Sequence, residues 1–111
     1  MPYIFVTNYI PYNKTQEAAK IFLDILKDYS AETKGVGNYI IPNAVKARKD
    51  HIEVVGVAEV EESNVGKYLQ IEQKYQANFH NIEGYSYTIE VRLKVQEALE
   101  MMGLKMPKKS N

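Results

Sequence analysis

The residues best suited to chemistry in this sequence are a histidine, a carboxylate and a phenol on segments with strand character. His51 and Glu53 are two residues apart, so in an extended chain they lie on the same side. An imidazole titrates near neutral pH, and together with the carboxylate and the phenol of Tyr9 it could act as a general base or bind a polar ligand. The alternative is that His51 only begins a strand after the charged turn Arg48-Lys49-Asp50 and is solvated.

Several other chemistries lack the residues they need. The sequence has no cysteine, which excludes disulfides, thiolate metal sites and a cysteine nucleophile. Its two histidines, His51 and His80, are far apart, and we expect no metal site from one chain. Gly35-Val36-Gly37 lacks the third glycine and the strand-to-helix context of a phosphate-binding loop. We therefore expect no cofactor.

The bulk properties indicate one ordinary globular domain. The chain has 111 residues, of which 45% are hydrophobic and 25% charged, and we expect a single domain over residues 1–103 with a basic tail over residues 104–111. Fourteen basic residues balance fourteen acidic ones, so neither a nucleic acid nor a membrane is expected as a partner. No stretch resembles a signal peptide or a membrane span, and a cytoplasmic location is expected by elimination.

The elements that must position these side chains follow from hydrophobic periodicity. Aromatic and β-branched runs predict strands at residues 3–10, 38–45, 51–60 and 85–93. A helix is expected from a capping box of Asn13 and Gln16 to Tyr29, followed by a polar connection over residues 30–34. Ser63 is the expected N-cap of a second helix, which ends near residue 79, and a short closing helix is expected at residues 95–102, with Gly103 as its C-cap.

The resulting order, β-α-β-β-α-β, is the α+β arrangement called ferredoxin-like or split βαβ. Right-handed crossovers predict a four-stranded antiparallel sheet of order 4-1-3-2, with both helices on one face. Pro42 cannot donate a ladder hydrogen bond, so the strand that contains it belongs at an edge or carries a bulge. The second strand is an edge in this order.

Strand parity divides the sheet into two faces. The apolar or small even positions of residues 52–60 fit the helix face. The opposite, open face receives Phe5, Val55 and Val57, where a solvated antiparallel sheet would show polar residues. Because a large apolar patch on a soluble domain usually marks an interface, we expect a homodimer formed through the open face.

Antiparallel pairing also predicts where the candidate functional side chains lie. The end of the first strand lies beside the starts of the third and fourth strands, which brings polar side chains to one end of the open face. The candidate catalytic residues are His51, Tyr9 and Glu53. The full expected ligand-binding set is Phe5, Thr7, Tyr9, His51, Glu53, Val55, Val57, Ser86 and Thr88.

This pattern resembles the dimeric α+β barrel superfamily over about residues 3–93. The resemblance rests on the element order, on the tyrosine-ended first strand of residues 3–9, and on Gly56 and Ala58 in the third strand. It implies two subunits packed sheet on sheet, with an interior cavity. Members of the superfamily include cofactor-free monooxygenases, haem-degrading enzymes, isomerases and small uncharacterised domains, so the resemblance implies no single reaction.

The expected function is binding of a small, mostly apolar organic molecule in a cavity between sheet faces. A cofactor-independent monooxygenase- or isomerase-like activity is one form of this hypothesis. The alternative is a non-catalytic oligomerisation or ligand-sensing module, in which the apolar face serves only for association. RNA binding is disfavoured because Glu53 and Glu59 would repel phosphates on the face that an RNA-recognition motif uses.

Overall fold

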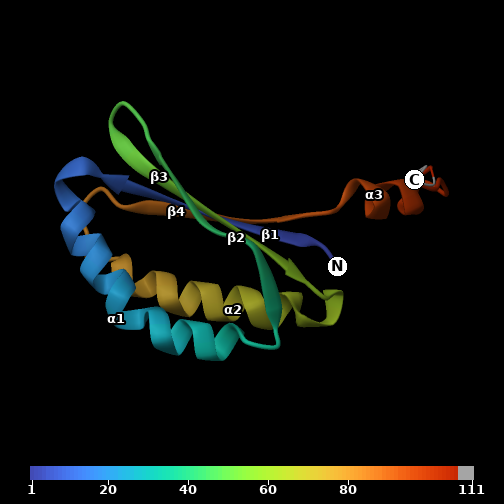
Figure 1. The fold of residues 1–111 in the computed structure, drawn as a ribbon, viewed down its shortest axis with the longest axis horizontal. Helices are drawn as coiled ribbons and strands as arrows, with labels where there is room; N and C mark the ends of the chain where they lie inside the picture. The colour runs from blue at the N-terminus through green and yellow to red at the C-terminus, as the bar shows by residue number, and fades with distance from the viewer. Residues whose placement is uncertain (108–111) are drawn as a thin grey trace.

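The regular elements of the computed structural model, which describes residues 1–107, follow one another in the predicted order (Figure 1). Short 3-10 turns precede α1 and α2 and follow α2. The strands and helices are β1 (Tyr3–Pro11), α1 (Thr15–Thr33), β2 (Gly37–Ala47), β3 (His51–Val60), α2 (Val65–Gln76), β4 (Ser86–Arg92) and α3 (Val95–Met101).

All four strands join in one antiparallel sheet of order β2-β3-β1-β4. Counted from the other edge, this is the predicted order 4-1-3-2. The register of β2 against β3 shifts between Tyr39 and Ile41 and again between Ile41 and Ala44. These irregularities flank Pro42 on an edge strand, as expected for a residue that cannot donate to the ladder.

The core forms where α1 and α2, lying side by side, cover one face of the sheet (Figure 1). Ile4 of β1, Val60 of β3 and Tyr68 of α2 are almost completely buried there. The parity of β1 and β3 therefore agrees with the prediction, since even positions face the helices. A second cluster of Ala18, Phe79 and Ile82 closes the end of this layer.

The helix ends differ from the predictions. Asn13 and Gln16 form no capping box, because residues Tyr12–Lys14 make a 3-10 turn and α1 begins at Thr15 without a side-chain cap. Ser63 is likewise inside a 3-10 turn and does not cap α2. The polar residues 30–33 continue α1 instead of leaving it, and the Thr33 hydroxyl donates to the Tyr29 carbonyl at 2.9 Å.

The C-terminal segment leaves the body of the domain. After β4 the chain extends to α3, which projects away from the sheet and from the other two helices (Figure 1). Gly103 has φ +76°, as expected of a residue just past a helix end. Residues 104–107 have no regular structure, and the rest of the predicted tail lies outside the described residues. Within residues 1–107, no helix is long and apolar enough to cross a membrane.

Two glycines with positive φ allow a test of the packing around the end of β1. Gly84 has φ +82°, and a Cβ there would lie 2.9 Å from Cγ of Pro11, whereas a Cβ at Gly103 would meet nothing within 4 Å. Gly84→Ala should lower the free energy of unfolding by about 2 kcal/mol or more, through both backbone strain and the clash. Gly103→Ala, the matched control, should cost about 1 kcal/mol or less because the helix end can fray. Urea denaturation measures both, and equal losses would contradict the packing of Gly84 against Pro11.

Candidate functional site

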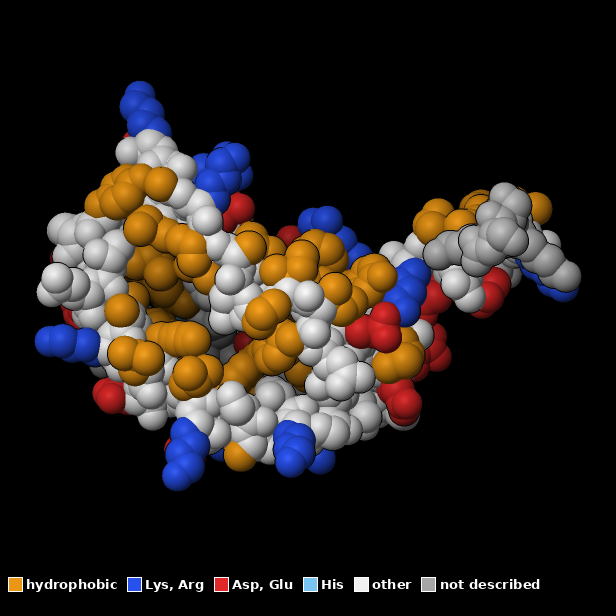
Figure 2. Space-filling view, viewed as in Figure 1, with side chains coloured by type: hydrophobic (Ala, Val, Ile, Leu, Met, Phe, Trp, Pro, Cys, Tyr) orange, Lys and Arg blue, Asp and Glu red, His pale blue; other side chains and the backbone are white. Residues whose placement is uncertain are grey.

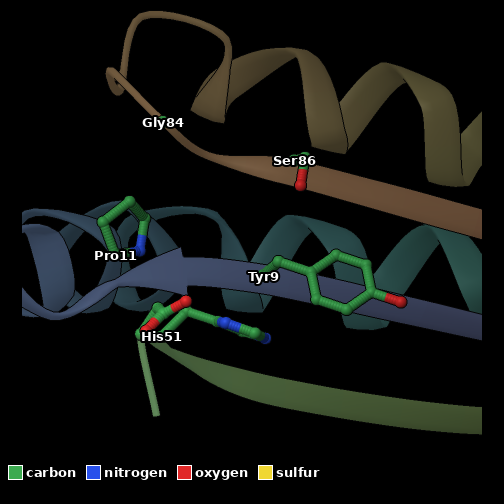
Figure 3. A pocket seen from close by; sticks show the side chains of 6 residues that line it. Tyr9, Pro11, His51, Gly84 and Ser86 are labelled. Carbon is green, nitrogen blue, oxygen red and sulfur yellow. The ribbon is translucent and has the colours of Figure 1, made fainter. Parts of the chain in front are cut away.

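The structure brings the polar residues predicted for the open face to one end of the sheet. Tyr9 pairs with Glu53 on one side and with Ser86 on the other. The rings of Tyr9 and His51 meet edge to face, with centroids 5.5 Å apart (Figure 3). Thr7 and Thr88 form the next pair along the strands.

Tyr9, His51 and Ser86 of this group line a surface hollow, whereas Glu53, Thr7 and Thr88 do not, and the predicted catalytic contact is not formed there. The hollow has a volume of about 500 Å³ and is lined by Tyr9, Pro11, Asp50, His51, Gly84 and Ser86. The Glu53 carboxylate accepts from Nε of Arg48 at 2.9 Å. No hydrogen bond joins Glu53 to His51 within the part of the chain that the structure describes.

The apolar centre of the open face is partly covered by the chain itself. Val57 is only 5% exposed, and Val55 and Phe5 are half-buried. The Arg92 guanidinium lies over the Phe5 ring at 4.4 Å from its centroid, a contact that combines cation–π attraction with shielding from water. Lys94 lies over the ring of Tyr3 in the same way, at 5.3 Å. Less apolar area is therefore open on this face than strand parity predicted.

A larger cavity lies on the opposite face, between the sheet and the helices. Its volume is about 650 Å³. Hydrophobic side chains gather around a hollow between the strands and α1 (Figure 2). Even positions of β1 and β3, the inner sides of α1 and α2, and part of β2 line it, including Ile4, Val6, Ala19, Phe22, Ile25, Val54, Gly56, Ala58, Tyr75 and Phe79.

Glu72 of α2 is the single charged residue among the described residues that line this cavity. It is only 3% exposed, and the Tyr29 hydroxyl of α1 donates to its Oε1. The Tyr68 hydroxyl lies 3.4 Å from that of Tyr29. Tyr39 of β2 packs against the Tyr29 ring, with centroids 6.1 Å apart. Three elements thus place phenols around one buried carboxyl.

Burial decides the protonation of this group. It raises the pKa of the Glu72 carboxyl to about 7, against the opposing effect of hydrogen bonding by Tyr68 and Tyr39. Burial also raises the pKa of the Tyr39 and Tyr68 hydroxyls, so both are neutral hydrogen-bonding groups at physiological pH. Glu72 is therefore the one group in the cavity that changes charge near neutral pH.

A second polar point lies one helical turn further along α2. The Tyr85 hydroxyl lies 2.5 Å from Oε1 of buried Gln76 and 2.9 Å from Oδ1 of Asn8. Asn8, Gln76 and Tyr85 all line the cavity. Its wall therefore offers one acidic group and one neutral amide group in a mainly apolar surface that also includes Thr15, Ser30 and Asn43.

None of the residues around Glu72 was predicted from the sequence to be a site residue. The signal that could have found them is the apolar stripe of α2, which runs through Val65, Tyr68, Tyr75 and Phe79 with the carboxylate at position 72 between them. A charged residue in the middle of a buried stripe breaks the amphipathic pattern. Such a break indicates a site.

Comparisons with known proteins support the fold and no more. No protein-family model and no curated protein matches this chain. Among solved structures, the chain is similar to a protein described as "De novo designed protein Foldit4". The match has a TM-score of 0.51 at 12% sequence identity and covers 84% of this chain and 97% of the designed one. Among residues 1–107, no group of three or more His, Asp or Glu side chains is placed to hold a metal ion.

The buried carboxyl predicts a specific pH dependence of stability. Its pKa of about 7 in the folded state is above the ordinary 4.5, so the folded protein holds this proton more tightly than the unfolded chain. The contribution to stability is complete below pH about 4.5 and is lost as pH rises to 7, by about 3 kcal/mol. Glu72→Gln should therefore stabilise the protein by about that amount at pH 8 and change little at pH 4.5.

Urea denaturation at the two pH values measures this difference. Glu62→Gln is the matched control, because Glu62 is exposed and lies in the turn that precedes the same helix. A Glu72→Gln variant that is less stable than wild type at pH 8 would show that the carboxylate, once ionised, has a stabilising partner in the fold.

Proposed function

We propose that this chain is a cytoplasmic ferredoxin-like domain of the dimeric α+β barrel type that binds a small, mostly apolar organic molecule. The binding site is the cavity between the sheet and helices α1 and α2. Glu72, Tyr29 and the amide of Gln76 provide the polar contacts. The observation that carries the proposal is a cavity of about 650 Å³ with an apolar wall and a few convergent polar groups.

The lining of the cavity favours an apolar occupant over water. The cavity opens to solvent, because Leu23 and Val45 of its lining are exposed. Water can fill it, but most of the wall offers water no hydrogen bonds. A ligand that displaces this water and buries its own apolar surface would gain roughly 25 cal/mol per Å².

A matched pair of substitutions on one helix tests the site. Ala19 and Ala31 are both exposed residues of α1, but Ala19 lines the cavity and Ala31 does not. The probe is the neutral fluorescent compound N-phenyl-1-naphthylamine, which should bind the wild-type protein with enhanced emission. Ala19→Phe should weaken this binding by about tenfold or more by filling the cavity, and Ala31→Phe should leave it unchanged. Equal binding by wild type and Ala19→Phe would overturn the assignment of the cavity.

An isomerase-like activity on the bound molecule is the second candidate function. The observation that favours it is the Glu72 carboxyl, which can take up and release a proton near neutral pH beside the Tyr29 hydroxyl. This differs from the predicted catalytic set of His51, Tyr9 and Glu53, which lies on the other face of the sheet. Nuclear magnetic resonance of the molecule recovered after incubation separates binding from turnover.

The second part of the proposal is the homodimer through the open face. The aromatic rings of Phe5 and Tyr3 lie there under Arg92 and Lys94. Much of the exposed apolar surface is on the projecting segment that follows β4. Its exposed side chains are Leu93, Val95, Met101, Met102, Leu104 and Met106. A seven-residue helix is not stable in isolation, so we propose that α3 packs on a second copy of the chain.

Charged substitutions in α3 and in the turn that follows it test this association. Met101 and Met102 are 77% and 65% exposed, and replacing both with Glu should not disturb the body of the domain. Sedimentation equilibrium at micromolar concentration should give a dimer for wild type and a shift toward monomer for the double variant. Leu23→Glu, at an equally exposed apolar position on α1, is the control and should stay dimeric. A monomeric wild-type protein would contradict the proposed dimer without affecting the cavity.

A further inference from the structure

We propose that the molecule bound in this cavity is a lipophilic amine, whose ammonium group pairs with the Glu72 carboxylate while its apolar part fills the space toward α1 and the sheet. This inference deepens the proposed function and rests on it. It names the chemical class of the ligand, which cavity size and apolarity alone leave open.

The first support is the charge of the cavity. Glu72 is 3% exposed and has no cationic neighbour among the described residues of the lining. The ion pairs of this domain are instead mostly on its surface, such as Lys74 with Glu32 at 2.8 Å and Arg92 with Glu90 at 3.1 Å. A buried carboxylate is strongly disfavoured unless a positive charge accompanies it. The cation that this site lacks is one that a ligand can bring.

The second support is the set of groups that surround the carboxyl. The titratable neighbours from every packed element are phenols: Tyr29 of α1, Tyr39 of β2, Tyr68 of α2 and Tyr85 just before β4. Tyr29 also meets Tyr75 edge to face, with centroids 5.4 Å apart. Aromatic faces attract cations through their quadrupole. A carboxylate among tyrosine rings therefore suits an organic ammonium better than an anion, which it would repel.

The third support is the way in which the affinity for an amine should depend on pH. An alkylamine stays protonated through pH 5–8, whereas the Glu72 carboxyl changes from mostly neutral to mostly ionised across this range. A bound ammonium must draw the carboxyl into its ionised form. Its affinity should therefore rise as pH increases from 5 to 8, and a neutral ligand should show no such rise.

Displacement of N-phenyl-1-naphthylamine by 1-octylamine and by 1-octanol tests the inference, because the two differ only in the polar end. At pH 8, octylamine should bind wild type about 10- to 100-fold more tightly than octanol, as expected for a charge-assisted contact. This preference should decrease at pH 5 and disappear in Glu72→Gln. Glu62→Gln, outside the cavity, should keep it.

The outcomes separate the two proposals. Equal affinities of the amine and the alcohol, both weakened by Ala19→Phe, would overturn the amine class and leave the cavity as an apolar binding site. Failure of the probe and of both competitors to bind wild type would overturn the proposed function itself. An amine preference that persists in Glu72→Gln would show that another group recognises the ammonium, and it would overturn the role of Glu72. Circular dichroism of each variant checks that it is folded.

Discussion

The contact between the Glu72 carboxyl and the Tyr29 hydroxyl is the interaction around which this domain is best understood. It joins α2 to α1 in the wall of the cavity and places a group that ionises near neutral pH where water has little access. A leucine at the same position would continue the apolar stripe of α2 and avoid the cost of burying an acid. A sequence that keeps a carboxylate there departs from its own folding pattern, and such departures occur chiefly where a site requires them.

The cavity follows from the geometry of the sheet above that contact. Four twisted strands present a wider apolar face than two helices can cover. β2, at the edge, is distorted around Pro42 and contributes Tyr39 to the rim of the cavity. Gly56 and Ala58 of β3 add little side-chain volume between the strands and the helices. The space results from small residues in the centre of the sheet and a distorted edge strand.

Local pattern was enough to predict the strands and their order, but not the site. The period of two in residues 51–60 gave β3 with its observed bounds, and Pro42 gave the irregular edge. The predictions of helix caps at Asn13 and Ser63 were wrong, because a 3-10 turn precedes each helix and contains the residue predicted to cap it. The cavity expected between sheet faces stays a prediction, and the one between the sheet and the helices was not predicted. Periodicity tells which residues face inward, but it does not tell whether the helices fill the space above them.

One face of the sheet lines the cavity and the other is the open face, and β3 contributes side chains to both. Its even positions Gly56 and Ala58 line the cavity, while Val55 and Val57 alternate with them on the open face. Successive side chains of a strand point to opposite faces, so β3 alone separates this part of the cavity from the open face. If the open face associates with a second copy, ligand and partner act on opposite sides of the same strand. By linkage, any effect of the ligand on the affinity for the partner would be matched by an equal effect of the partner on the affinity for the ligand.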